Sequence, residues 1–229
     1  MAKKNALKAL LFDLDGTLIE TVYEILDATN DTLQMLGETL VTQAQLRNWI
    51  GHGTKELLVS ALAHVRCTAR PDIRSWTKLP EAFDAFDNFY LKRCGTRSHL
   101  YPGVKEVLDK ARNTEIKMAV VTNKETRFTH ALLKAHALEK YFDGIVCGDT
   151  LSSKKPNPQG VQFCLEQFCV KPIEAIFIGD SSIDAQTARN AGMSVWLMPY
   201  GYNMGVPLEG SNPDRIAGGF RDLFEVLSD

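Results

Sequence analysis

Leu10-Leu11-Phe12-Asp13-Leu14-Asp15-Gly16-Thr17-Leu18 is the stretch that decides the fold of this chain. An apolar run over 9–12 predicts a short buried strand, which stops at two carboxylates two residues apart. Because alternate residues of an extended strand share a face, Asp13 and Asp15 are expected to project the same way. Open α/β folds place their ligands at the carboxyl edge of the sheet, where this pair would lie.

The two carboxylates have a chemical and a structural interpretation. Two like charges about 4 Å apart repel by roughly 4 kcal/mol at an effective dielectric constant of about 20. A bridging cation removes this repulsion, and carboxylate oxygens suit Mg²⁺. The pair is therefore a candidate metal site with a spare nucleophile. The alternative is a strand end with two solvated acids, which is the commoner case for an isolated Asp-x-Asp. Motifs elsewhere in the chain are needed to choose between the two interpretations.

The composition is that of an ordinary globular protein. Of 229 residues, 45% are hydrophobic and 24% are charged, which is enough for a sizeable core. The formal net charge of −2 argues against a nucleic-acid partner, and no apolar run approaches the length of a membrane span. Lys8 and Asp13 interrupt the first apolar run, so we expect no signal peptide.

The cysteines are odd in number and include no Cys-x-x-Cys pair. They are Cys67, Cys94, Cys147, Cys164 and Cys169. This pattern favours reduced thiols over a disulfide framework or a zinc site, and so predicts a cytoplasmic protein.

Apolar spacing divides the chain into a helical block and an alternating part. Helical spacing recurs from about residue 20 to about residue 95, with no convincing strand. Beyond residue 101, strands are predicted over 117–122, 144–147, 175–178 and 194–198, and helices over 102–112, 125–136, 158–168, 183–191 and 220–227. Continuously apolar strands separated by helices predict an α/β fold with a parallel sheet covered on both faces. We expect the helical block to be an insertion in this fold.

Reactive side chains follow three of the predicted strands. The first strand ends in the Asp13/Asp15 pair, and the segments 122–124 and 179–184 follow two others. Because the carboxyl ends of parallel strands lie on one edge, these segments should converge in one crevice. Acids, a hydroxyl beside backbone amides and a lysine near residue 155 are what phosphoryl transfer to a carboxylate requires. The attacking carboxylate and the phosphate are both negative, so cations must offset their repulsion.

These segments, in this order and spacing, resemble the four motifs of the haloacid dehalogenase superfamily. The resemblance covers nearly the whole chain and rests on Asp13-Leu14-Asp15-Gly16-Thr17-Leu18, Thr122-Asn123, Lys155-Pro156 and Gly179-Asp180-Ser181-x-x-Asp184. It implies a Rossmann-like core with a parallel sheet flanked by helices, formed by residues 1–19 and 96–229. It also implies that residues 20–95 form an inserted α-helical cap of the C1 type.

The resemblance implies a Mg²⁺ site built from four aspartates. Asp13 matches the nucleophile that becomes the aspartyl-phosphate and also binds the metal. Asp15 matches the general acid/base, with its backbone carbonyl on Mg²⁺, and Asp180 matches a metal ligand. For Asp184 two roles stay open, because it could support the metal through water or cap the following helix.

The resemblance also implies a phosphate site. Thr122 with Asn123 matches the phosphate-holding second motif, and Lys155 matches the lysine of the third motif. The neighbouring Lys154 is expected to be a solvated side chain. Together with the aspartates, these residues imply an enzyme that hydrolyses a small phosphate ester.

Three further strings resemble the phosphoglycolate phosphatase family within this superfamily: Asn48-Trp49-Ile50-Gly51-His52-Gly53, Tyr101-Pro102-Gly103-Val104 and Tyr200-Gly201-Tyr202-Asn203. The implied substrate, 2-phosphoglycolate, carries a carboxylate. Gly51 and Gly53, just ahead of a helix, would expose backbone amides that could receive it. Arg47, His52 and Lys55 are nearby candidates for additional positive charge. The alternative is an ordinary interhelical turn with His52 exposed.

Two positions depart from the family pattern. Glu20-Thr21 stands where the family commonly has Asp-Ser, and Asn157 stands where the third motif commonly has His. Both positions lie where the cap closes or at the rim of the site, so they bear on the substrate rather than on the reaction.

Several functions are compatible with this set of motifs. Besides a phosphoglycolate phosphatase, they fit an isomerase resembling β-phosphoglucomutase, or a phosphatase of another small ester, a nucleotide or pyrophosphate. A non-catalytic relative is disfavoured, since it need not retain these costly charges. We expect a small-molecule partner, no nucleic acid or membrane, and a monomer or homodimer.

Overall fold

The computed structural model describes residues 6–227. Among them, the main sheet has six parallel strands in the order β5-β4-β1-β6-β7-β8. The strands are β1 (Ala9–Phe12), β4 (Lys117–Val121), β5 (Gly144–Val146), β6 (Ala175–Gly179), β7 (Ser194–Leu197) and β8 (Arg215–Ile216). The first stretch, β1, lies between β4 and β6, with Phe12 opposite Val120 and Ile178. The predicted α/β class is confirmed.

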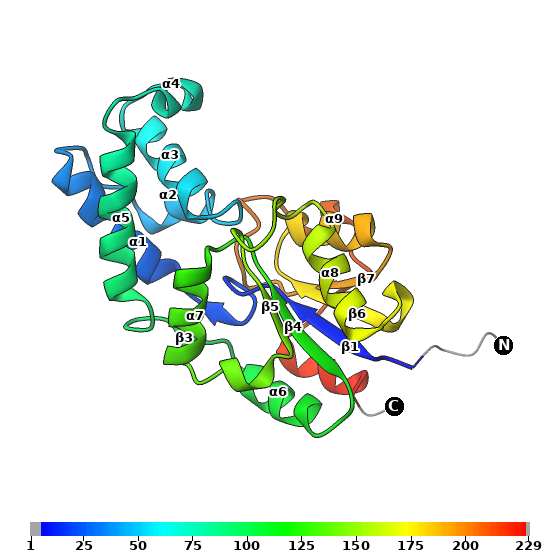
Figure 1. Cartoon of the computed structure of the whole chain (residues 1–229). Helices are drawn as coiled ribbons and strands as arrows, with labels where there is room; N and C mark the ends of the chain where they lie inside the picture. Colours follow the sequence, from blue (N-terminus) through cyan, green and yellow to red (C-terminus); the bar gives the residue numbers. More distant parts are fainter. Residues whose placement is uncertain (1–5, 228–229) are drawn as a thin grey trace.

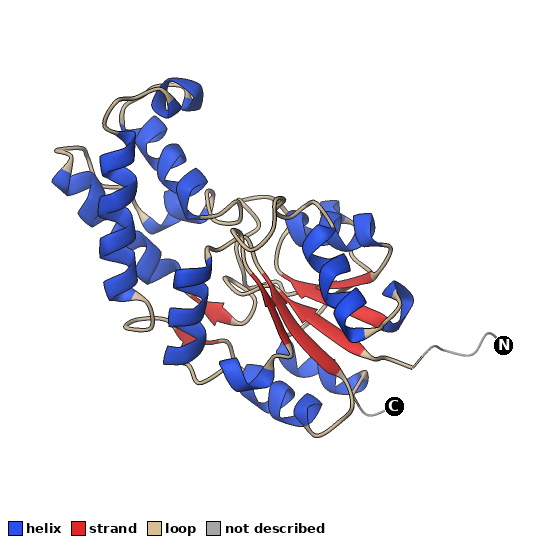
Figure 2. Ribbon diagram, viewed as in Figure 1, coloured by secondary structure: helices blue, strands red, loops and turns tan. Residues whose placement is uncertain are grey.

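Helices cover both faces of this sheet (Figure 2). Four α-helices do so: α6 (Val104–Arg112), α7 (Thr126–Ala135), α8 (Gln159–Phe168) and α9 (Ser182–Ala191). Leu10 and Phe12 share a buried cluster with α6 and α7, whereas Ala9 and Leu11 share another with α8 and α9. The alternation of β1 side chains between two apolar layers explains why this strand is apolar throughout.

The last predicted helix, over 220–227, has a different form. Residues Phe220–Glu225 make a 3₁₀ helix, η4. Phe220 and Leu223, three residues apart, are both buried in the sheet core. A three-residue repeat suits the 3₁₀ helix, which has three residues per turn. β8 was not predicted, because two residues, one of them charged, carry no apolar pattern.

Five helices form a separate group beyond the sheet (Figure 1). They are α1 (Val22–Met35), α2 (Gln43–Arg47), α3 (Thr54–Val65), α4 (Arg70–Arg74) and α5 (Leu79–Arg93). Their buried side chains, Leu58 and Phe86 among them, make a second hydrophobic cluster, which Phe128 of α7 and Tyr202 join from the sheet side. The short helix α4 was not predicted. That this group is a cap domain with bounds 20–95 stays a prediction, and residues 1–5 and 228–229 of the predicted core lie outside the described residues.

A small antiparallel pair of strands connects the helical group to the sheet. β2 (Ile19–Glu20) pairs with β3 (His99–Leu100), so that Glu20 lies opposite His99. The expectation that helical structure starts at Glu20 is therefore wrong by two residues, and α1 begins at Val22. The chain enters and leaves the helical group at the same place.

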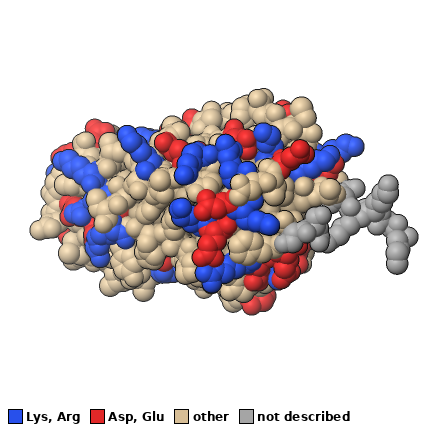
Figure 3. Space-filling view, turned by 90° about the horizontal axis from the view of Figure 1, so that it is seen from below, with Lys and Arg blue, Asp and Glu red and all other residues tan. Residues whose placement is uncertain are grey.

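Charged side chains of both signs are interspersed on the face seen in Figure 3, in keeping with the small net charge. No helix within residues 6–227 is long and apolar enough to cross a membrane.

Candidate active site

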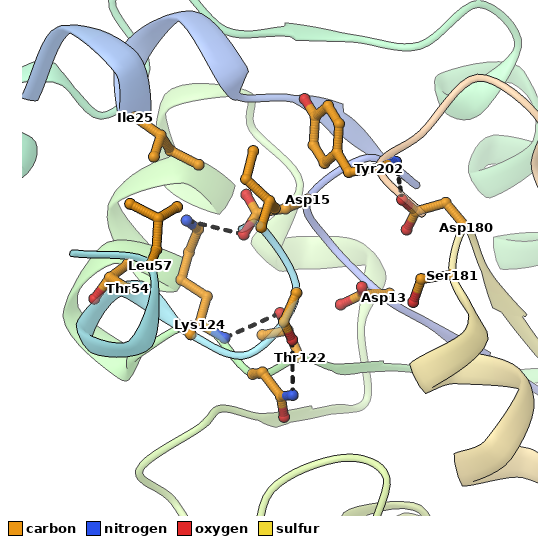
Figure 4. A pocket seen from close by; sticks show the side chains of 14 residues that line it. Asp13, Asp15, Ile25, Thr54, Leu57, Thr122, Lys124, Asp180, Ser181 and Tyr202 are labelled. Atoms are coloured by element: carbon orange, nitrogen blue, oxygen red, sulfur yellow. Dashed lines mark hydrogen bonds and ion pairs between the residues drawn. The ribbon is translucent and has the colours of Figure 1, made fainter. Parts of the chain in front are cut away.

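The carboxyl ends of three neighbouring strands meet at one cavity (Figure 4). Asp13 follows β1, Thr122 follows β4 and Asp180 follows β6, as predicted from the strand ends. The cavity is lined by Asp13, Asp15, Ile25, Ile50, Gly51, Gly53, Thr54, Leu57, Thr122, Asn123, Lys124, Asp180, Ser181 and Tyr202. The sheet supplies its polar floor, and α1, α3 and the turn before α3 supply most of its apolar side chains.

Three buried aspartates concentrate negative charge at the floor of this cavity. Carboxylate oxygens of Asp13, Asp180 and Asp184 all lie within 4.8 Å of one another. Burial raises the pKa of Asp13 to about 6, and the nearby Asp184 adds to the shift. Burial also raises the pKa of Asp180 well above its usual value, and the charges of Asp184 and Asp13 act in the same direction. Three hard oxygen donors with an excess of negative charge fit a divalent cation such as Mg²⁺.

Lys155 is the counter-charge of this cluster. Its ammonium lies 2.8 Å from Oδ1 of Asp13 and 2.7 Å from Oδ1 of Asp184, and its side chain is 3% exposed. Asn123 fixes the lysine backbone, because its Oδ1 accepts the Lys155 N–H at 2.8 Å and its amide donates to the Lys155 carbonyl at 3.0 Å. Asn123 thus positions the third-motif lysine, a role that its place in the second motif did not indicate.

Asp184 caps a helix, which is one of the two roles left open. Its Oδ2 accepts the N–H groups of Asp180 and Ser181, both at 3.1 Å, and the Ser181 hydroxyl at 2.7 Å. Together with Ser181 it forms a capping box at the start of α9. A contact of Asp184 with the metal through water stays a prediction.

Asp180 is held from two sides. The Thr17 hydroxyl donates to its Oδ1 at 2.9 Å, and the Tyr202 N–H donates to its Oδ2 at 2.5 Å. A Cβ atom on Gly16 or Gly201 would clash with its carboxylate. These two glycines therefore allow the backbone to approach the carboxylate closely.

Asp13 and Asp15 line the same cavity, as expected, but the extended strand does not continue to Asp15, because β1 ends at Phe12 and Leu14 lies in a bend. Asp15 consequently has partners of its own. Its Oδ1 accepts the Thr21 hydroxyl at 2.6 Å, and its Oδ2 lies 2.9 Å from the ammonium of Lys124 (Figure 4). Asp13 instead pairs with Lys155. The two carboxylates are thus linked to two different lysines.

Lys124 is a site residue whose role the motifs did not indicate; it is the last residue of the segment 122–124 that follows β4. Its side chain is 1% exposed, and its ammonium contacts Oδ2 of Asp15 and donates to the Tyr90 hydroxyl at 2.6 Å. The signal that could have found it is its position directly after Thr122-Asn123, at the end of a central strand.

Gly51 and Gly53, which were predicted to receive the substrate carboxylate, line the cavity. Arg47, His52 and Lys55, which were predicted to add positive charge, do not. The Gly51 carbonyl oxygen accepts a hydrogen bond from the side-chain amide of Asn123 at 2.9 Å. Gly53 has a φ of +94° and packs so close to the Asn123 carbonyl that a Cβ would clash with it. His52 is exposed and lies outside the cavity lining.

The other two cationic candidates have different partners. Arg47 reaches Oε2 of Glu20 at 3.3 Å and the Gly201 carbonyl at 3.4 Å, and Lys55 lies over the ring of Phe83. Neither lines the cavity.

A carboxylate of the chain itself already lies at the start of α3. Oε2 of Glu125 accepts the Thr54 hydroxyl at 2.7 Å, and Lys154 lies 3.8 Å from its Oε1. The expectation that a substrate carboxylate binds the amides before α3 therefore has a competitor in Glu125.

Glu20, the first departure from the family pattern, is buried and contacts side chains from three segments of the chain. Its carboxylate accepts hydrogen bonds from the hydroxyls of Tyr202 and Tyr101, the latter at 2.9 Å, and pairs with Arg47. It thereby connects α2, the segment directly after β3 and the loop whose Tyr202 contacts Asp180. Asn157, the second departure, is exposed and accepts the Gln159 N–H at 2.9 Å, which places it in the turn before α8.

The raised pKa of Asp13 predicts how the stability of the metal-free protein depends on pH. In the unfolded chain the pKa stays near 3.8, and in the folded protein it is about 6. The folded state therefore binds more protons between these values, so the free energy of unfolding should fall as the pH rises from about 4 to 6. The contribution of Asp13 is about 3 kcal/mol. Urea unfolding in EDTA at pH 4.5 and 7.5 measures about 2 kcal/mol of this contribution, because the carboxyl of the unfolded chain is already mostly deprotonated at pH 4.5, and Asp13→Asn should reduce the fall. An equal fall in wild type and variant would contradict this assignment.

A family model described as haloacid dehalogenase-like hydrolase matches residues 10–198 of this chain. The chain belongs to this family. The resemblance seen in the motifs is thereby confirmed, together with the Rossmann-like core.

Relatives of this hydrolase share its full length. The phosphoglycolate phosphatase of Vibrio parahaemolyticus is 36% identical over 225 residues, covering 97% of this chain and 96% of the relative. That of Photobacterium profundum is 36% identical over 228 residues, covering 99% and 98%. Among solved structures, a "predicted phosphoglycolate phosphatase" from Haemophilus somnus has a TM-score of 0.88 at 28% identity, covering 96% and 97%. CbbY from Rhodobacter sphaeroides in complex with phosphate has a TM-score of 0.81 at 25% identity, covering 97% and 100%.

Proposed function

We propose that this hydrolase is a Mg²⁺-dependent phosphomonoester hydrolase that forms an aspartyl-phosphate on Asp13. One observation carries the proposal: Asp13 lies in the cavity with the Lys155 ammonium 2.8 Å from its Oδ1 and the carboxylates of Asp180 and Asp184 within 4.8 Å. A nucleophile, a cation and the donors for a divalent metal thus meet at one point. Asp13 and Asp180, with support from Asp184, would hold the ion. Bound Mg²⁺ would supply positive charge against the repulsion between the phosphate and Asp13.

The reaction would have two steps, formation and hydrolysis of the aspartyl-phosphate. A carboxylate oxygen of Asp13 attacks phosphorus and the ester P–O bond breaks, while protonated Asp15 gives its proton to the leaving oxygen. Asp15 then takes a proton from water, whose oxygen attacks the phosphorus and releases inorganic phosphate and free Asp13. The Thr21 hydroxyl, 2.6 Å from Asp15, orients this acid/base. The Thr122 hydroxyl and Lys155 hold the phosphate oxygens.

We infer that the substrate is 2-phosphoglycolate, which yields glycolate and phosphate. The relatives from V. parahaemolyticus and P. profundum carry the name of this activity. The apolar side chains of Ile25, Ile50 and Leu57 line the same cavity as Asp13, Asp15 and Asp180. All five cysteines are free thiols, which supports the proposed cytoplasmic location.

Relative kcat/KM over a panel of phosphate esters tests this function. The panel contains 2-phosphoglycolate, sugar monophosphates, nucleotides and pyrophosphate, each with Mg²⁺. We expect the highest kcat/KM for 2-phosphoglycolate and no interconversion of sugar phosphates. A higher value for another ester would overturn the substrate, and isomerisation of a sugar monophosphate without phosphate release would overturn the hydrolase.

Gly201→Ala is expected to weaken Mg²⁺ binding by about 10- to 100-fold, because the added methyl group would displace the Asp180 carboxylate. Gly210→Ala is the matched control, since no atom lies within 4 Å of its added Cβ. Calorimetric titration of each protein with Mg²⁺ gives the affinity independently of turnover. Equal affinities in the two variants would mean that Asp180 does not bind the metal.

A further inference from the structure

We propose that Lys124 binds a negative charge on the leaving group of the substrate, which for 2-phosphoglycolate is the glycolate carboxylate. This inference rests on the proposed function and deepens it. It replaces Arg47, His52 and Lys55 as the source of positive charge for that group, because none of those three lines the cavity.

Lys124 is the one cationic side chain among the described residues that line the cavity. It enters from the end of β4, with its ammonium near Ile25 and Leu57 of the helical group and Oδ2 of Asp15 (Figure 4). Residues of the sheet and of the helical group thus both surround it.

The ammonium retains one donor for a ligand. A lysine ammonium has three N–H groups. Its contacts in the structure account for two of them, the Asp15 carboxylate at 2.9 Å and the Tyr90 hydroxyl at 2.6 Å. The Tyr90 ring also lies 4.6 Å from the ammonium and helps to hold it in place. The lysine is therefore fixed in the cavity wall with capacity for a further acceptor.

The contact with Asp15 places Lys124 on the side of the leaving group. Asp15 gives its proton to the leaving oxygen, so the groups next to Asp15 face the alcohol part of the substrate. In 2-phosphoglycolate one methylene separates that oxygen from the carboxylate. A cation 2.9 Å from Oδ2 of Asp15 is accordingly within reach of the carboxylate.

The apolar neighbours make this contact selective. Ile25, Ile50 and Leu57 offer no hydrogen bonds to a carboxylate, and a buried carboxylate without a partner is strongly disfavoured. A substrate with an anionic leaving group should therefore depend on Lys124, whereas one with a neutral leaving group should not.

The test compares 2-phosphoglycolate with 2-hydroxyethyl phosphate, in which a CH₂OH group replaces the carboxylate. We expect wild type to prefer 2-phosphoglycolate. Lys124→Met should lower kcat/KM for 2-phosphoglycolate by about 100-fold, mainly through KM, and change kcat/KM for 2-hydroxyethyl phosphate less than about 5-fold. Lys124→Arg should restore part of the preference. Lys92→Met, an exposed lysine on α5, is the matched control and should leave both values unchanged.

An equal fall on both esters would overturn the inference, since Lys124 would then act through Asp15. If wild type hydrolyses both esters with equal kcat/KM, the inference about Lys124 is overturned and the proposed hydrolase function is retained. Failure of wild type to hydrolyse any monoester, p-nitrophenyl phosphate included, would overturn both. If circular dichroism shows that Lys124→Met is unfolded, Lys124→Gln provides the same comparison with a polar side chain.

Discussion

Replacing Asp13 with Asn should lower kcat by at least about 10⁴-fold for every phosphate ester, because the variant lacks the attacking carboxylate. The loss should not depend on the leaving group, since formation of the phosphoryl–enzyme bond is required for good and poor leaving groups alike. Steady-state phosphate release from 2-phosphoglycolate and from p-nitrophenyl phosphate measures it. Circular dichroism and urea unfolding should show a folded protein.

The matched control is Asp84→Asn, which removes one carboxylate from the exposed side of α5. Its kcat should equal that of wild type. Appreciable phosphatase activity in Asp13→Asn, at more than about 1% of wild type, would contradict a covalent mechanism at this residue. The acid-quenched wild-type enzyme should also carry phosphate on Asp13 after brief incubation with substrate, and the variant should carry none.

Replacing Asp15 with Asn is expected to have an effect of similar size that does depend on the leaving group. An asparagine cannot give a proton to the leaving oxygen, so kcat for 2-phosphoglycolate should fall by about 10²- to 10⁴-fold. The first step with p-nitrophenyl phosphate, whose leaving group needs no proton, should be much less affected. The comparison of burst and steady-state rates on the two esters separates this step from hydrolysis of the intermediate.

Thr21→Val is the companion variant to Asp15→Asn. It removes the hydroxyl that donates to Oδ1 of Asp15 at 2.6 Å and retains the acid itself. A smaller fall in kcat with the same dependence on the leaving group is expected. Equal losses on both esters in Asp15→Asn would exclude Asp15 as the general acid.

The convergence of the site could be predicted from the sequence, because it depends on topology alone. Once the strands over 9–12, 117–122 and 175–178 are parallel, their carboxyl ends share an edge, and Asp13, Thr122 and Asp180 follow. The apolar runs that identify these strands are long enough to be recognised.

The partners of individual side chains could not be predicted in this way. The Asp15–Lys124 pair depends on where the chain turns after Phe12, which the two-residue spacing of the aspartates does not indicate. The contacts of Glu20 come from three segments remote in sequence. Strands of two residues, such as β2 and β8, are too short to carry a periodic pattern.

Because β2 pairs with β3, related enzymes could exchange the inserted helical segment without a change in the sheet. Ile19 lies opposite Leu100, so the two ends of the helical insertion are neighbours in space. Lengthening, shortening or exchanging the segment between them leaves the spacing of the sheet strands unchanged, since a tight hairpin could bridge the same gap. A change in the inserted segment could therefore alter the apolar side chains of the cavity, Ile25, Ile50 and Leu57, while Asp13, Asp180 and Lys124 keep their places at the ends of the sheet strands.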